Sequence, residues 1–139
     1  MKIISYAFKN NDAIPDKYTC HGDDISPALE INDVPQGAKS LALIVSDPDA
    51  SSGGFIHWLL WNIKPETTVI EEGNAPEGSV QGENSGKKNV YIGPCPPSGM
   101  HHYHFKIYAL DDILNLTPDS KKDDLEKAME YHVIDSAEI

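Results

Sequence analysis

Short apolar runs of strand length, separated by turn-forming residues, constrain the fold of this chain most. Ser40–Ser46 (SLALIVS) is almost continuously apolar, as is typical of a strand buried on both faces. The next run alternates instead, with His57, Leu59, Trp61 and Ile63 on one face and Trp58, Leu60 and Asn62 on the other. The chain also contains 10 glycines and 10 prolines. Together these features favour β structure with many turns.

Further strands are predicted over residues 1–9, 29–34, 101–110 and 132–139. Residues 64–89 are polar and predict a long surface excursion. One helix follows Ser120, which is a good N-cap, with Asp123 at the position of a capping-box acid. Because strands and helices do not alternate, we expect a mainly β fold: an antiparallel β-sandwich with one or two short helices near the C-terminus. The 139 residues predict a single domain over 1–139.

The charge balance excludes several classes of partner. The chain has 22 acidic and 11 basic residues, for a net charge of −11. A nucleic-acid-binding protein needs a basic surface, and so does a protein that docks on anionic lipid by charge. No run is long enough to cross a bilayer, and the first ten residues lack the apolar core of a signal peptide. We therefore expect a cytoplasmic protein that binds no nucleic acid and does not insert into membranes.

Cys20 and Cys95 are too few for a disulfide scaffold and are not spaced as a metal or redox pair. Both lie in loops rich in glycine, proline and small polar residues, so they could meet in space. In a reducing compartment we expect two free thiols.

The unusual polar groups lie in three segments that adjoin predicted strands. They are Asp47-Pro48-Asp49-Ala50, His57-Trp58, and the stretch from Gly93-Pro94-Cys95-Pro96-Pro97 to His101 and Tyr103. If 101–110 is a strand, His101 and Tyr103 lie at the rim of its apolar face, after a turn stiffened by three prolines. A histidine held at the rim of an apolar interior is typical of a binding pocket.

The residue types in these segments point to an anion as the ligand. A carboxylate beside an imidazole favours the protonated ring, so His57 or His101 could attract an anion. Backbone N–H groups around Gly93 and Cys95 could donate to phosphate oxygens, and Tyr103 adds a hydroxyl. Such local donors would let an acidic protein hold an anion.

Other histidines have simpler interpretations. His102 and His104 share a strand face and could hold zinc, but no third ligand is evident, so a solvated face is the better prediction. His132 is a cap or packing residue, and His21 has no assigned role. Taken alone, Asp47-Pro48-Asp49 would be a turn, and Trp58 and Trp61 would be core residues.

Six motifs in order resemble the phosphatidylethanolamine-binding protein (PEBP) family, which includes the Raf kinase inhibitor proteins. They are Tyr18-Thr19-Cys20-x-Gly22, Ser26-Pro27-x-Leu29, Ser40-Leu41-Ala42-Leu43, Asp47-Pro48-Asp49-Ala50, His57-Trp58, and Gly93-Pro94-x-Pro96-Pro97-x-Gly99-x-His101-x-Tyr103-x-Phe105. The closer match is the short bacterial and archaeal branch. The chain departs from the pattern at Ser51, where proline is usual, at His102, where arginine is frequent, and at Tyr131, where glycine is common.

The resemblance implies a β-sandwich with a small anion pocket lined by Asp47, His57, His101 and Tyr103. Asp49, Ala50, Gly93 and the Cys95 backbone would shape that pocket. It implies a phosphate-like anion or phospholipid head group as ligand, a kinase or protease as protein partner, a homodimer, and no catalytic turnover. No cofactor and no metal are expected.

Two other functions remain open. The chain could inhibit serine proteases through a surface loop such as 73–89. A hydrolase that uses His and Asp residues, with or without zinc, is the third hypothesis. Against this hypothesis, the sequence contains neither a Gly-x-Ser-x-Gly elbow nor a His-Glu-x-x-His motif.

Overall fold

The structure is a computed structural model that describes residues 1–10, 13–48, 54–95 and 103–139. Every strand pairing in it is antiparallel, which confirms the predicted mainly β sandwich. One sheet has the order β1 (Lys2–Ile4), β2 (Leu29–Asn32), β5 (Val69–Ile70). The larger sheet has the order β6 (Val80–Gln81), β4 (Phe55–Ile63), β3 (Ser40–Asp47), β7 (His104–Leu110), β8 (Val133–Glu138). A 3₁₀ turn, η1 (Asp16–Tyr18), and one α-helix, α1 (Lys122–Met129), complete the described elements.

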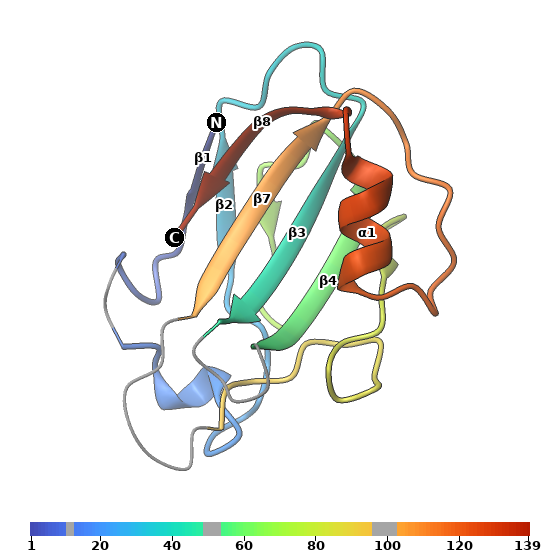
Figure 1. The fold of residues 1–139 in the computed structure, drawn as a ribbon. Coiled ribbons are helices and arrows are strands. Elements are labelled where there is room, and N and C mark those ends of the chain that lie inside the picture. Colours follow the sequence, from blue (N-terminus) through green and yellow to red (C-terminus); the bar gives the residue numbers. More distant parts are fainter. Residues whose placement is uncertain (11–12, 49–53, 96–102) are drawn as a thin grey trace.

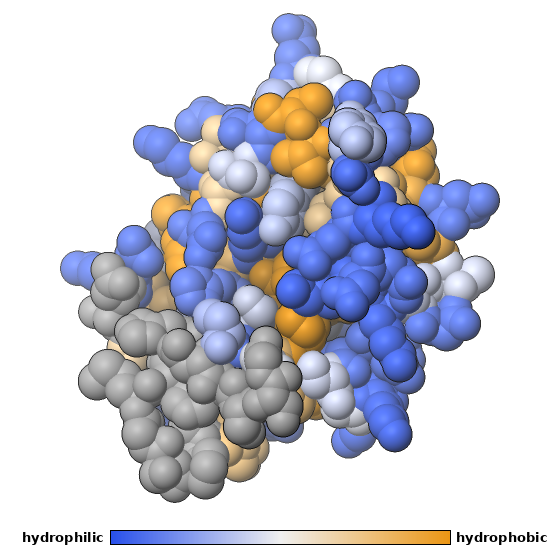
Figure 2. Space-filling view, viewed as in Figure 1, coloured by the Kyte–Doolittle hydropathy of each residue, from blue (hydrophilic) through white to orange (hydrophobic). Residues whose placement is uncertain are grey.

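The elements form three layers, with the larger sheet in the middle. The smaller sheet covers one face of it and α1 crosses the other, over β3 and β4 (Figure 1). Between the sheets lies the main core, which includes Ile31, Leu43, Trp58 and Phe105. A second cluster joins the sheet to α1 through residues such as Trp61 and Leu125. The surface around α1 is mainly hydrophilic in Figure 2.

Strand β3 is buried on both faces, as its apolar run predicts. Leu41, Leu43 and Val45 lie in the main core, whereas Ala42 and Ile44 lie in the cluster under α1. The neighbouring strands hold β3 in a central position: Ile44 faces Leu59 of β4 on one side and Lys106 of β7 on the other.

Strand β4 contains two irregularities of register that break its predicted alternation. Leu43 pairs with Leu60 but Leu41 pairs with Ile63, so β4 has one extra residue there. Asn62 takes up the irregularity with a φ of 55°. The prediction that Ile63 shares a face with Trp61 was therefore wrong, because Ile63 lies in the main core instead. A bulge shifts every later side chain to the opposite face.

Several predicted boundaries were also wrong. The first strand covers only Lys2–Ile4, and the 64–89 excursion contains the short strands β5 and β6. Helix α1 has Lys121 as N-cap, not Ser120, and the Lys121 backbone N–H donates to Asp124 Oδ2 at 2.9 Å, not to Asp123. The cap lies one residue later because the Ser120 backbone is bound elsewhere: its carbonyl accepts from Glu83 N at 2.9 Å.

No helix within the described part of the chain is both long and apolar enough to cross a membrane.

Candidate functional site

The ends of three adjacent strands bring several predicted site residues together. Asp47 ends β3 and pairs with Phe55 at the start of β4. Tyr103 directly precedes β7, whose first residue, His104, pairs with Ser46. Asp47 is only 3% exposed, so it is buried at this end of the sheet. Three further predicted residues, Asp49, Ala50 and His101, lie outside the described residues.

His57 is the extra residue of the second β4 irregularity. Val45 pairs with Trp58 and Ser46 pairs with Ile56, so His57 has no partner in β3. Bulges are common next to binding sites because they redirect a side chain. The ring contacts Phe55, with centroids 4.8 Å apart, and meets Tyr103 edge-on at 5.6 Å. Thus His57 and Tyr103, which are far apart in the sequence, lie against each other as predicted.

One hydrogen bond fixes the tautomer of His57. Its Nδ1 lies 2.8 Å from the Ile92 carbonyl oxygen, which can only accept, so Nδ1 carries a hydrogen. In the neutral ring Nε2 is then an acceptor. Nε2 is buried and has no hydrogen-bond partner among the described residues. His57 as a whole is only 5% exposed. A buried polar atom without a partner requires an explanation, and a missing ligand is one.

Burial keeps this imidazole neutral. Loss of solvation lowers the pKa of His57, and the Ile92 carbonyl and the Asp47 and Asp24 carboxylates raise it by less. The sequence analysis took account of the carboxylate but not of desolvation, which has the larger effect on the pKa of His57 in the folded protein. Burial, and secondarily Asp47, also raise the pKa of Tyr103, so its hydroxyl stays protonated at neutral pH.

The loop after η1 forms a second wall with the loop before Cys95. Gly93 N donates to Asp24 Oδ1 at 2.6 Å. This N–H is therefore not available to a ligand, contrary to the expectation from the sequence. Gly93 is required here for close approach, since a Cβ would lie 2.4 Å from the Tyr18 carbonyl oxygen. The sequence analysis did not identify Asp24. The one signal that could have found it is its position two residues after the Tyr18-Thr19-Cys20-x-Gly22 motif.

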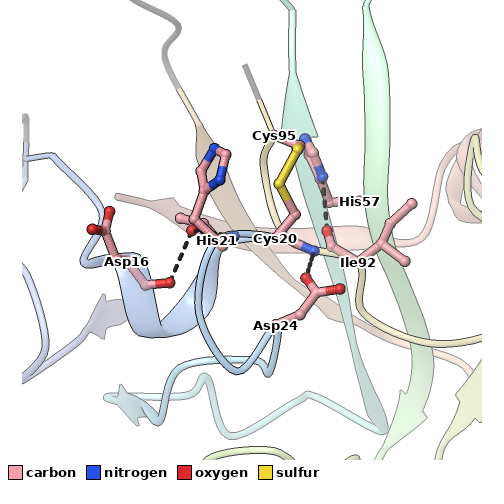
Figure 3. Close-up of a disulfide and its surroundings, with 9 residues drawn as sticks. Asp16, Cys20, His21, Asp24, His57, Ile92 and Cys95 are labelled. Atoms are coloured by element: carbon pink, nitrogen blue, oxygen red, sulfur yellow. Dashed lines mark hydrogen bonds between the residues drawn. A yellow bond between two sulfur atoms is a disulfide. The ribbon is translucent and has the colours of Figure 1, made fainter. Parts of the chain in front are cut away.

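A disulfide joins these two loops. Cys20 and Cys95 are bonded across 75 residues, which corrects the expectation of two free thiols. The sequence showed only that the two loops could meet, whereas the fold places the two Cα atoms 5.3 Å apart, within the range of a disulfide. In Figure 3 the disulfide joins the two loops beside His21.

The other described histidines on the β7–β8 side have carboxylate partners. His104 Nδ1 bonds Glu138, and His132 Nδ1 lies 2.8 Å from Asp111 Oδ1. The favoured interpretation of His104 as a solvated surface residue agrees with this pairing.

A cavity of about 300 Å³ borders the site from another direction. It shares Asp47 and Phe55 with the site, but His57 and Tyr103 do not line it. Its far wall is formed by 83–85 and by the start of α1, including Lys121 and Lys122.

Comparison with known proteins decides the family. The family model described as phosphatidylethanolamine-binding protein matches residues 4–139. The chain belongs to the PEBP family. The resemblance seen in the six motifs is therefore confirmed.

Close PEBP relatives occur in archaea and bacteria. A UPF0098 protein of Methanothermobacter thermautotrophicus is 48% identical over all of this chain and 95% of its own length. A UPF0098 protein of Pyrococcus horikoshii is 49% identical over 98% of this chain and 73% of its own length. The crystal structure of a PEBP homologue from Chlamydia trachomatis, 41% identical, superposes with a TM-score of 0.95 over 99% of this chain and 93% of that one.

A solved structure from Escherichia coli extends the comparison to lower identity. YbcL, described as a member of the mammalian PEBP family, is 30% identical, with a TM-score of 0.93 over 99% of this chain and 94% of that one.

Proposed function

We propose that this PEBP-family protein binds a small oxyanion of the phosphate type, without catalytic turnover, at the strand ends around His57. The observation that carries the proposal is His57 Nε2, a buried ring nitrogen without a partner in the described structure. The opposite nitrogen is held by the Ile92 carbonyl, so the ring cannot simply reverse its two nitrogens to satisfy Nε2. A ligand atom at Nε2 would remove the cost of this buried acceptor.

The protonation state of the site restricts how an anion binds. Neutral Nε2 offers a lone pair, which repels a bare anionic oxygen, and the buried carboxylate of Asp47 is close by. An oxyanion therefore binds together with one proton. That proton is either on the ligand, as in a hydrogen phosphate, or on His57, whose pKa the bound anion would raise. Phosphate esters suit this requirement because their second pKa is about 6.

Nuclear magnetic resonance titration tests the proposal with two probes, inorganic phosphate and phosphoethanolamine. We expect amide shifts around Asp47, His57 and Tyr103 in the wild type, and their loss in His57→Gln. The matched control is His104→Gln, which removes a surface imidazole paired with Glu138 and should leave the titration unchanged. Unchanged spectra in the wild type, or an undiminished response in His57→Gln, would refute the proposal. A preference for phosphoethanolamine over phosphate would indicate a lipid head group as the natural ligand.

Proton uptake provides an independent test. Calorimetry at about pH 8, where phosphate is mainly a dianion, should show close to one proton taken up for each anion bound. The measurement is repeated in buffers of different ionisation enthalpy. Binding with no proton uptake at this pH would contradict the role given to His57.

Regulation of a kinase or another protein partner and a homodimeric state are proposed with this function on the basis of the family resemblance. A cytoplasmic location is proposed from the lack of an apolar signal-peptide core in the first ten residues. An occupied pocket would be the element that a partner senses. Co-purification with and without phosphate is the corresponding experiment.

Protease inhibition is a second candidate, favoured by the exposed loop at 85–90. Buried Asn84 holds this loop: its Oδ1 accepts from Gly86 N and Lys88 N, and its Nδ2 donates to the Val90 carbonyl. A rigid loop that presents Lys87 and Lys88 suits a protease with an acidic specificity pocket. Trypsin inhibition that is lost in Lys87→Ala and Lys88→Ala would support this role, and an inactive wild type would exclude it for that class of protease.

A further inference from the structure

Three potential ligands for a soft metal ion lie together outside the proposed anion site. The sulfur atoms of Cys20 and Cys95 and a ring nitrogen of His21 all lie within 4.8 Å of one another, and the three residues are exposed. Cys20 and Cys95 are oxidised to a disulfide in the structure, with His21 beside it (Figure 3). The spacing of the two cysteines in the sequence gave no sign of this cluster, because it is created by the meeting of two distant loops.

These loops are held together by more than the disulfide. Cys20 N donates to the Pro94 carbonyl at 3.2 Å, and the Tyr91 hydroxyl donates to the Tyr18 carbonyl at 2.8 Å. The Gly93–Asp24 hydrogen bond described above is a third link. Tyr91 is itself buried and packs edge-on against Trp58. Breaking the S–S bond therefore leaves the two thiols and the imidazole in each other's neighbourhood.

The backbone of His21 is held in place by its own loop. His21 N donates to Thr19 Oγ1 at 3.2 Å, and Thr19 Oγ1 donates to the Asp16 carbonyl at 2.8 Å. A Cβ on Gly22 would lie 2.2 Å from the same Asp16 carbonyl oxygen, so the loop folds back tightly on η1. This local order lowers the entropy cost of fixing three ligands around one ion.

We propose that reduction of the Cys20–Cys95 disulfide creates a zinc-binding site formed by Cys20, His21 and Cys95. A dithiol reductant transfers two electrons and two protons, so that the S–S bond breaks, two S–H bonds form, and the reductant becomes a disulfide. Zinc then displaces the two thiol protons and forms two Zn–S bonds and one Zn–N bond. A site with two thiolates and an imidazole favours zinc over calcium or magnesium.

The distances suit this change. With Zn–S bonds of about 2.3 Å, tetrahedral geometry separates two sulfur ligands by about 3.8 Å. The sulfurs must therefore move apart from their bonded positions, while the imidazole approaches by a rotation of its side chain. The fourth position is open to solvent because all three residues are exposed. The dithiol and the disulfide are two oxidation states of the same pair of sulfurs, so zinc binding and the disulfide are alternative states of one site.

Metal titration of the whole protein tests this proposal. The wild-type chain is reduced with a phosphine, freed of the reductant without oxygen, and titrated with Zn²⁺ against a chromophoric chelator, in parallel with oxidised protein. We expect one zinc ion per reduced chain and none at this site in the oxidised chain. Cobalt in place of zinc should give the thiolate charge-transfer and tetrahedral absorption bands.

Variants assign the ligands. Cys20→Ser should abolish binding, and His21→Ala should weaken it by at least about tenfold. The matched control His132→Ala removes another exposed imidazole and should have no effect. Circular dichroism of the reduced chain shows whether it stays folded. Unfolding on reduction, no zinc uptake by the reduced wild type, or uptake unaffected by Cys20→Ser or His21→Ala would each overturn the proposal.

Discussion

The two irregular positions of strand β4 differ in how completely their side chains are satisfied. Asn62, near the end of the strand, donates through Nδ2 to the Leu114 carbonyl and accepts at Oδ1 from Leu114 N, both at 2.8 Å. His57, near the start, uses one ring nitrogen on Ile92 and leaves the other buried without a partner in the described structure. The first irregularity is closed by the protein itself, whereas the second leaves a polar atom with which the proposed ligand would pair.

A further buried nitrogen sharpens the meaning of this difference. Trp61 Nε1 also has no partner among the described residues. Trp61 is fully buried among the apolar side chains of the cluster under α1. Within the described ranges, His57 is the residue that combines an unpaired buried nitrogen with polar neighbours at the strand ends. The polar surroundings of His57 are what make its unpaired nitrogen the basis of the proposed anion site, whereas Trp61 has no such surroundings.

The largest effect is expected at the closed irregularity. Asn62→Ala should lower the free energy of unfolding by about 2–4 kcal/mol, because it leaves both Leu114 backbone groups unpaired and places a Cβ-bearing residue without a compensating bond at a φ of 55°. Denaturant unfolding measures the loss. Asn62→Gly is the control: it should recover about 1 kcal/mol of backbone strain but not the two hydrogen bonds. Equal losses in the two variants would show that backbone strain plays no part.

A second left-handed position, Tyr131, measures the backbone contribution on its own. Tyr131 follows α1 with a φ of 68° and is 93% exposed, so its side chain contributes little packing. Glycine is favoured at such helix ends. Tyr131→Gly should therefore raise the free energy of unfolding by about 1 kcal/mol. Tyr131→Ala, which keeps a Cβ, should give little gain. An equal gain in both variants would attribute the effect to loss of the exposed ring.

These comparisons show which features of the fold the sequence could predict. The buried strand β3 was predictable because its apolar run needs no knowledge of its neighbours. The β4 irregularities were not, because an extra residue is defined only relative to the partner strand. Likewise, the disulfide and the role of Asp24 depend on two loops about 70 residues apart coming together. His57, Asp47 and Tyr103 were predicted as neighbours, but the lowered pKa of His57 and the raised pKa of Tyr103 were not, since both depend mainly on burial.

A smaller stability effect is expected at the open irregularity. His57→Phe should change the free energy of unfolding by less than about 1 kcal/mol, because loss of the hydrogen bond to Ile92 is offset by removal of a buried unpaired nitrogen. A phenyl ring also preserves the contacts with Phe55 and Tyr103. Urea unfolding beside Asn62→Ala makes the comparison directly. A loss as large as that of Asn62→Ala would mean that His57 has a structural role and would weaken the case for a ligand.

The smallest effect is the pH dependence of stability that His57 contributes. Burial lowers the pKa of His57 in the folded protein below the value of about 6.5 expected in the unfolded chain. Above that pH both states are neutral and stability is complete. As the pH falls below it, the unfolded chain takes up a proton first, so stability decreases until the pH reaches the lower folded pKa, and then levels off.

Subtracting the unfolding curves of His57→Gln from those of the wild type between pH 8 and pH 5 isolates this contribution from the carboxylates. Parallel curves for the two proteins would contradict it. Addition of phosphate sharpens the test, since a bound anion favours the imidazolium that the empty site disfavours. Stabilisation of the wild type by phosphate should therefore grow as the pH falls toward the folded pKa of His57, and His57→Gln should lack that growth. The same buried nitrogen would then account both for a cost to the empty protein and for its affinity for a ligand.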